Sequence, residues 1–150
     1  MVALTEMNHD EFTKWSNHVW VAYREELLRA GLSETEAELN VRENLAVTMP
    51  EGIPLPGNYI FNVVENEKNI GVVWVCDRDS KWFIYDIEID EHLRGQGLGR
   101  ATMRAIEEFV KGKGGSEISL SVFGFNEVAR KLYETEGYET TRLAMTKKLG

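Results

Sequence analysis

The chain has 150 residues and a mass of 17.1 kDa, and its 43% hydrophobic and 28% charged residues are ordinary for one globular domain spanning residues 1–150. Its 17 Lys and Arg against 25 Asp and Glu give a net charge of −8. That balance argues against a dedicated nucleic-acid-binding protein, because such proteins neutralise phosphates with cations. Cys76 is the only cysteine, so an intrachain disulfide is excluded and a reducing, cytoplasmic location is expected. No signal-peptide pattern and no apolar run of about 18 residues is present, so no membrane segment is expected.

Two helices are predicted in the first third of the chain. Apolar residues recur every three or four positions over residues 12–28, which is the spacing of an amphipathic helix, and Gly31 is a typical residue to follow its end. Ser33 and Glu36 have the spacing of a capping box and predict the start of a second helix. That helix stops before residues 50–57, where all three prolines of the chain lie, and these predict a rigid surface loop rather than a domain linker.

From residue 58 onward the hydrophobic period becomes two, which is typical of strands. Runs of β-branched and aromatic residues at 59–64, 70–76 and 82–89 are separated by short polar turns, and they predict an antiparallel meander. The apolar residues 2–4 add an edge strand.

Helix and strand alternate in the last third of the chain. The helical period returns over residues 101–110, and a strand is predicted at residues 118–123. Asn126 precedes a further helix that Gly137 closes, and residues 138–149 form a last extended segment. The order of helices, meander, helix, strand, helix and strand predicts an α/β (α+β) fold with a mixed sheet.

A glycine-rich turn lies between the strand at 82–89 and the helix at 101–110. It consists of Arg94, Gly95, Gln96, Gly97, Leu98, Gly99 and Arg100. Glycines at the start of a helix leave backbone N–H groups open to a ligand, and the helix N-terminus favours an anion such as phosphate. The dinucleotide fingerprint requires a third glycine where Arg100 stands, and the Walker loop requires Ser or Thr where Gly114 follows Gly112 and Lys113. Neither of these two phosphate loops fits.

The Arg-x-x-Gly-x-Gly pattern of Arg94, Gly97 and Gly99 resembles the pyrophosphate loop of the GNAT superfamily, the acyl-CoA-dependent N-acyltransferases. A second group of residues lies downstream in the order of that family's other signature: Asn126, Ala129, Tyr133, and Gly137 followed by Tyr138. The resemblance covers approximately residues 58–149. It implies a mixed, mostly antiparallel central sheet with helices on both faces, and a splayed strand pair that binds CoA.

The resemblance also implies which residues contact the co-substrate, acetyl-CoA, without any metal. The implied cofactor-binding residues are Ile87, Glu88 and Ile89 through their backbone at the pantetheine, Arg94, Gly95, Gln96, Gly97, Leu98, Gly99 and Arg100 at the pyrophosphate, and Asn126, Ala129 and Tyr133 on the next helix. Asn126 is equally a good N-cap for any helix, and both interpretations stay open.

Tyr133 is the predicted general acid. The resemblance places a tyrosine beside the cofactor sulfur, and a phenol of pKa about 10 can protonate a leaving thiolate. The alternative is a core aromatic residue on an amphipathic helix. Asp86 and Glu88 are the candidate catalytic bases for the amine, since they lie on the strand that lines the expected cleft. They share one face if the alternation holds, a bulge would move either, and a solvated strand face is the competing interpretation.

The sequence therefore predicts an enzyme, an N-acetyltransferase that moves an acetyl group from acetyl-CoA directly to a primary amine of a small molecule or peptide. The alternative is a non-catalytic acyl-CoA-binding sensor or regulatory module. The net charge of −8 favours a cationic acceptor. His9, His18 and His92 lack the spacing of a metal site, and the tryptophans of the first helix are core candidates that could also wall an acceptor pocket. The acceptor, the base, the acyl group and the oligomeric state stay open, although residues 138–149 could pair across a homodimer.

Overall fold

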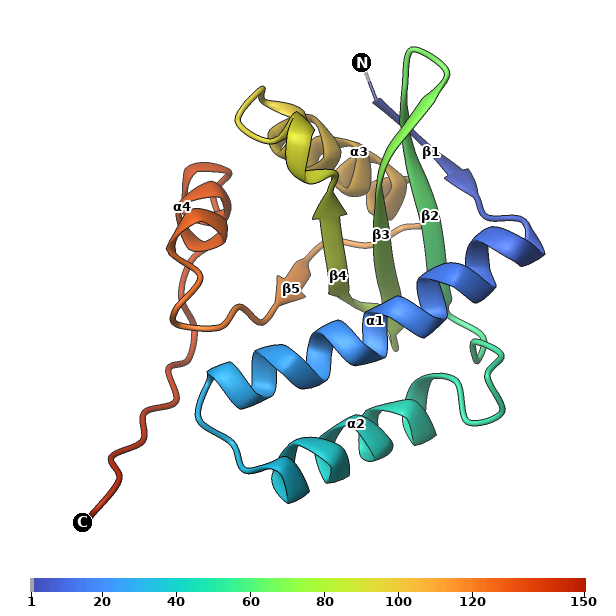
Figure 1. Cartoon of the computed structure of the whole chain (residues 1–150). Coiled ribbons are helices and arrows are strands. Elements are labelled where there is room, and N and C mark those ends of the chain that lie inside the picture. The colour runs from blue at the N-terminus through green and yellow to red at the C-terminus, as the bar shows by residue number, and fades with distance from the viewer. Residues whose placement is uncertain (1) are drawn as a thin grey trace.

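The computed structural model describes residues 2–150 as one five-stranded sheet with helices on both faces (Figure 1). The strands lie in the order β1-β2-β3-β4-β5 and comprise Val2–Glu6, Asn58–Glu65, Lys68–Arg78, Lys81–Ile89 and Ile118–Leu120. Neighbouring strands from β1 to β4 pair antiparallel, while β5 pairs parallel to β4. This mixed, mostly antiparallel sheet confirms the predicted fold class.

The helices are α1 (His9–Arg29), α2 (Glu34–Thr48), the short 3-10 helix η1 (Glu91–Leu93), α3 (Leu98–Gly112) and α4 (Glu127–Thr135). Both N-terminal helices begin at a capping box. At α2, Ser33 Oγ accepts from the Glu36 N–H at 3.2 Å and the Glu36 carboxylate accepts from the Ser33 N–H at 2.9 Å, which confirms the predicted capping box. Asn8 and Glu11 form the same pair of hydrogen bonds at the start of α1. Within the residues described, no helix is long and apolar enough to cross a membrane.

Two hydrophobic cores hold the helices against the sheet. On one face, α3 buries apolar residues such as Met103 and Ile106 against the valines of β2 and β3, and we call this the α3-side core. On the other face, α1 and α2 cover the sheet (Figure 1), and Trp15 and Val19 of α1 pack with Trp74 in the α1-side core. The order of the strands and the two cores place both faces of β4 in contact with helices.

Three element boundaries differ from the prediction. Helix α3 begins at Leu98 rather than at residue 101, because Gly97, at φ 79°, turns the chain directly into the helix. Strand β5 ends at Leu120 rather than at residue 123, because it diverges from β4 and has no further partner there. The predicted last strand is wrong: residues 138–149 form no strand in the structure.

Candidate active site

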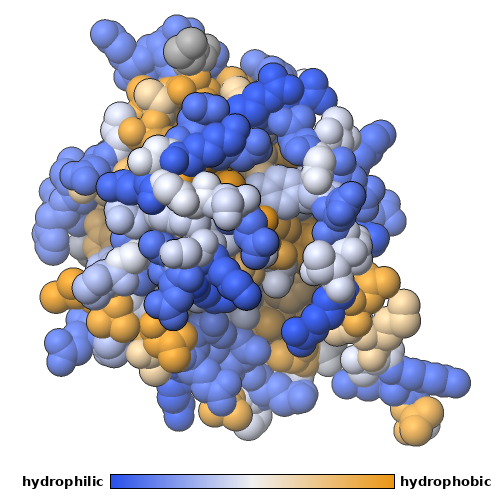
Figure 2. All heavy atoms as spheres, turned by 180° about the vertical axis from the view of Figure 1, so that it is seen from behind, coloured by the Kyte–Doolittle hydropathy of each residue, from blue (hydrophilic) through white to orange (hydrophobic). Residues whose placement is uncertain are grey.

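Strands β4 and β5 diverge halfway along β4. Their pairing runs from Trp82 opposite Ile118 to Ile84 opposite Leu120, and residues 85–89 have no strand on that side within the part of the chain that the structure describes. The surface opposite α1 and α2 shows a hollow floored by hydrophobic side chains (Figure 2). The structure therefore contains the splayed strand pair that the sequence predicts.

A β-bulge on β4 decides which side chains face α1. Trp74 of β3 lies opposite Asp86 whereas the next residue, Val75, lies opposite Ile84, so Tyr85 is the extra residue. Tyr85 packs with the α1-side core, while Ile84 belongs to the α3-side core. Because Tyr85 is the extra residue, Asp86 faces the same side of the sheet as Tyr85, and side chains alternate again from Asp86 onward. Asp86 and Glu88 therefore both lie on the face covered by α1, so the bulge places both candidate bases on that face.

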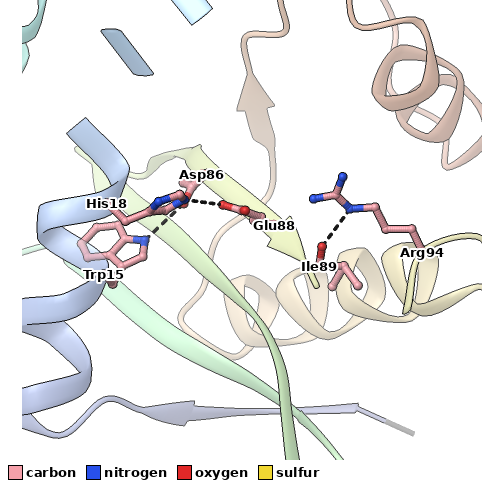
Figure 3. Close-up of polar contacts among 6 residues, drawn as sticks. All are labelled: Trp15, His18, Asp86, Glu88, Ile89 and Arg94. Carbon is pink, nitrogen blue, oxygen red and sulfur yellow. Dashed lines mark hydrogen bonds and ion pairs between the residues drawn. The ribbon is translucent and has the colours of Figure 1, made fainter. Parts of the chain in front are cut away.

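The backbone of β4 beyond the bulge has one side open. The Asp90 N–H donates to the Ile70 carbonyl at 2.9 Å, so the alternation of an antiparallel ladder directs the backbone of Glu88 toward β3 and that of Ile87 and Ile89 away from it. The Nε–H of Arg94 donates to the Ile89 carbonyl from that open side at 2.9 Å (Figure 3). Of the backbone contacts implied for the pantetheine, those of Ile87 and Ile89 therefore have access to the opening.

The two carboxylates of β4 each contact a residue of α1 (Figure 3). Trp15 Nε1 donates to Asp86 Oδ2 at 3.2 Å, and His18 Nε2 lies 3.4 Å from Glu88 Oε2. Burial beneath the helix raises the pKa of Asp86 from 3.8 to about 6, partly offset by the hydrogen bond from Trp15, while the charges of Glu88 and Glu26 add to the rise. A carboxyl group with this pKa titrates close to neutral pH, which is the property of a useful general base.

Tyr133 lies on α4, where its ring packs against the α3-side core. No hydrogen bond to its hydroxyl is found within the described residues, so the hydroxyl remains available to a ligand. Burial, and then the charges of Asp86 and Glu26, raise the pKa of Tyr133 to about 12. The phenol therefore stays protonated at neutral pH, and the carboxylates of the α1-covered face are close enough to influence it.

The glycine-rich turn leads into the N-terminus of α3. Gly95 and Gly97 both have positive φ, at 81° and 79°, and residues 94–97 are exposed. The first intrahelical bond of α3 is donated by Ala101 to the Gly97 carbonyl, so the N–H groups of Leu98, Gly99 and Arg100 have no partner inside the helix. No acidic side chain occupies this first turn and no side chain caps it, which leaves the helix end suited to an anion.

An ion pair with Glu136, at the end of α4, restrains the side chain of Arg100. Its Nε lies 3.1 Å from Glu136, whose side chain is only 6% exposed and also pairs with Arg104 at 3.3 Å. This carboxylate joins the start of α3 to the end of α4, so the glycine-rich turn and the Tyr133 helix are positioned relative to each other.

Asn126 caps α4, because its Oδ1 accepts from the Ala129 N–H at 3.2 Å. The N-cap interpretation is thus confirmed, since the side-chain oxygen of Asn126 is occupied by the backbone N–H of Ala129. The amide Nδ2 of Asn126 has no partner within residues 2–150, and a contact from it to a ligand stays a prediction.

Sequence reasoning missed the contribution of α1 to this site. Trp15 appeared there only as a core or pocket-wall candidate, His18 was considered only as a metal ligand, and Glu26 was not considered. Their spacing along one helix face is visible in the sequence, but the strand residues that they meet are not. Among the residues described, no group of three His, Cys, Asp or Glu is arranged to hold a metal ion.

Comparisons with known proteins agree with this geometry. The model of the "Acetyltransferase (GNAT) family" matches residues 12–138. An uncharacterized N-acetyltransferase of Bacillus subtilis (strain 168), YycN, is 32% identical over 154 residues and 99% of each chain, and its crystal structure superposes with a TM-score of 0.91 at 30% identity over 99% of both chains. A second uncharacterized N-acetyltransferase of the same organism, YdgE, is 25% identical over 97% of each chain. The aminoglycoside N-acetyltransferase AAC(6')-Iy shares the fold, with a TM-score of 0.59 and 16% identity over 99% of this chain and 95% of its own. The chain belongs to the GNAT family of acetyltransferases and is an acyltransferase enzyme.

Proposed function

We propose that this enzyme transfers an acetyl group from acetyl-CoA directly to a primary amine that carries positive charge. The observation that supports the proposal most strongly is the opening beside residues 85–89 of β4, because Tyr133 and Asp86 both lie near it with pKa values suited to opposite roles. Solved relatives of the same fold include complexes of AAC(6')-Iy with CoA and with a CoA bisubstrate analog. The lone Cys76 suits a reducing compartment, and the cytoplasm is the proposed location.

The residues present fit a CoA molecule along its length. The open N–H groups at the start of α3 and the positive φ of Gly97 suit a pyrophosphate, which needs backbone donors and close approach. The guanidinium of Arg94 donates only its Nε–H within the described residues, so its other N–H groups remain for a phosphate. The open side of the Ile87 backbone, the N–H of Ile89 and the free amide of Asn126 suit the amides of the pantetheine arm.

The proposed chemistry assigns one proton transfer to each side of the opening. Asp86 accepts a proton from the incoming ammonium group, directly or through water, and the freed amine nitrogen bonds to the thioester carbonyl carbon. The carbon–sulfur bond then breaks, and the Tyr133 hydroxyl gives its proton to the departing sulfur. The nitrogen loses its second proton, directly or through water, to the Tyr133 phenolate, and Asp86 releases the first proton to solvent. Burial keeps Tyr133 protonated, and a pKa of about 6 still leaves most of Asp86 ionised at pH 7, so both groups hold the required protonation state.

The acceptor is proposed to be a cation because of the charges around the α1-covered face. The charge of Glu88 contributes to the raised pKa of Glu26, and the charges of Glu88 and Glu26 contribute to that of Asp86, which means that three carboxylates share one region. A second ammonium group on the acceptor would relieve this repulsion while the first one reacts. Neutral amines are accordingly expected to be poorer acceptors than diamines or lysine-bearing peptides.

A thiol-release assay over a panel of amines tests the proposal. The wild-type enzyme is expected to release CoA with at least one cationic amine, and Tyr133→Phe is expected to lower kcat by about 100-fold or more while CoA affinity stays within about twofold. Tyr59→Phe is the matched control, because Tyr59 is an aromatic residue packed on the same core from β2. CoA binding without thiol release from any amine would instead support the non-catalytic sensor.

A further inference from the structure

Three aromatic side chains beside the opening belong to neither hydrophobic core. Tyr23 lies on α1, and Phe123 and Phe125 lie on the segment between β5 and α4. All three are half-buried, and none of them packs in the α1-side core or in the α3-side core. A ring stabilises a fold in proportion to the area that it removes from water, so these rings contribute less than core rings do. Packing of the fold alone does not account for them.

The three rings contact one another where the segment after β5 lies beside the end of α1 (Figure 1). The ring centroids of Tyr23 and Phe123 are 6.4 Å apart, and those of Phe123 and Phe125 are 5.4 Å apart in a stacked arrangement. This segment continues β5 after its divergence from β4, so it lies across the opening from β4. We call the three rings the aromatic wall, because they border the opening on the side of α1.

The ring of Tyr23 is held in place from α2. The Tyr23 hydroxyl donates to Asn40 Oδ1 at 2.8 Å, and Asn44 Nδ2 donates to the same oxygen at 2.9 Å. Trp20 meets Tyr23 edge to face, with 6.4 Å between the ring centroids. A ring whose orientation is already fixed binds a ligand with a smaller loss of entropy than a mobile ring does. Tyr23 is thus pre-oriented for contact with a bound molecule.

The aromatic wall lies close to the proposed reaction centre. Burial raises the pKa of Tyr23, and the charges of Glu26 and Tyr85 add to the rise. Glu26 follows Tyr23 by one helical turn on α1, is half-buried and forms no ion pair among the residues described. Its charge also adds to the effect of burial on the pKa of Asp86 and of Tyr133. Glu26 therefore connects the aromatic wall with both proposed catalytic groups.

Aromatic rings beside a carboxylate suit an alkyl chain that carries a cation. The rings cover methylene groups, and the methylene groups next to an ammonium share its positive charge, which attracts them to a ring face. Cations of the protein already contact rings in this region, since the guanidinium carbons of Arg29 and Arg78 lie 4.2 Å from the ring centroids of Phe125 and Phe83. A small polar amine would leave the aromatic wall uncovered.

We infer that the acceptor carries its reacting amine on a chain of several methylene groups, and that Tyr23 and Phe123 contact this chain while the amine reaches Asp86. The inference rests on the proposed acetyl transfer to a cationic amine and adds the feature by which the enzyme selects among such amines. Tyr23 and Phe123 are then specificity-determining residues, and Asn40 is a positioning residue that acts through Tyr23.

The rate of CoA release with α,ω-diamines of three to six carbons tests the inference. All of these diamines carry the same two charges, so they differ in the length of the apolar chain. In the wild type kcat/KM is expected to rise about two- to fourfold with each added methylene group, because each one is removed from water. In Tyr23→Ala and in Phe123→Ala the value for the six-carbon diamine is expected to fall by about tenfold or more, mainly through KM, and that for the three-carbon diamine by less than about threefold.

Three further variants separate the rings from other effects. Tyr23→Phe keeps the ring, so it is expected to keep the dependence on chain length. Glu26→Gln removes a charge, so it is expected to lower kcat/KM for every diamine and to leave the increment per methylene group unchanged. Leu39→Ala is the matched control, because Leu39 is an apolar residue of α2 that is 52% exposed, and it should behave as the wild type does.

CoA affinity, measured by calorimetry, is expected to stay within about twofold in both alanine variants, since neither ring belongs to a core. Diamines that react without any dependence on chain length overturn the inference, although acetyl transfer to cationic amines then stands. A dependence that persists in both alanine variants, or that Glu26→Gln abolishes, also overturns it. No CoA release with any amine refutes the proposed function and the inference together.

Discussion

Replacing Asp86 by Asn is expected to stabilise the protein while it inactivates the enzyme. Burial raises the pKa of this carboxyl group from 3.8 to about 6, so the folded state binds the proton more tightly than the unfolded chain does. The free energy of unfolding of the wild type therefore falls as the pH rises from about 4 to about 6. Two pKa units at 1.36 kcal/mol each mean that ionised Asp86 lowers the free energy of unfolding by about 3 kcal/mol at pH 7.

Asn has almost the shape of Asp, and its carbonyl oxygen can still accept the hydrogen bond from Trp15, so the substitution removes the charge and little else. The Asn variant is expected to gain up to about 3 kcal/mol at pH 7, or roughly 6 to 12 °C in Tm for a chain of this size. At pH 4 the two proteins are expected to be equally stable, because Asp86 is then protonated in the folded state.

Thermal unfolding between pH 4 and 8 measures the stability, and the thiol-release assay over the same range measures kcat. In the variant kcat is expected to fall by at least about 100-fold, and the activity step near pH 6 is expected to vanish. Asp90→Asn is the control, because Asp90 is exposed and its side chain caps nothing at η1. A variant that is no more stable than the wild type at pH 7 would refute the argument from burial, and one that keeps full activity would remove Asp86 as the base.

Two further substitutions test the remainder of the site. Gly97→Val is expected to abolish CoA binding, measured by calorimetry, because a β-branched residue is strained at a φ of 79°. Gly112→Ala is the control at the other end of α3, where φ is not positive, and it should bind CoA normally. Glu136→Ala is expected to lower the free energy of unfolding, measured in urea, by about 1 to 2 kcal/mol, because it removes the carboxylate that pairs with Arg100. A change below about 0.3 kcal/mol would mean that the α3–α4 contact does not stabilise the fold.

Local chemistry explains why much of the fold could be predicted. The capping box of Ser33 and Glu36, the prolines of residues 50–57 and the period-two runs each act over a few residues, so they specify helix starts, loops and strands directly. The glycine-rich turn likewise predicts a strand before it and a helix after it, although α3 begins at Leu98, directly after Gly97, rather than at residue 101.

Long-range packing explains what could not be predicted. The bulge at Tyr85 depends on the register between β3 and β4, and it brings Asp86 under Trp15 although 71 residues separate them. No local pattern specifies that contact, so the role of α1 was missed. Residues 138–149 have strand propensity, but a strand also needs a neighbour, and no strand pairs with this segment in the structure described.

Residue-resolved amide exchange with and without CoA tests the central claim, that the open side of β4 binds the pantetheine arm. The N–H groups of Ile87 and Ile89 are expected to become slower to exchange by at least about tenfold when CoA is added. That of Glu88, which the ladder directs toward β3, is expected to be slow already and to change little. CoA binding that leaves Ile87 and Ile89 unchanged would contradict the claim.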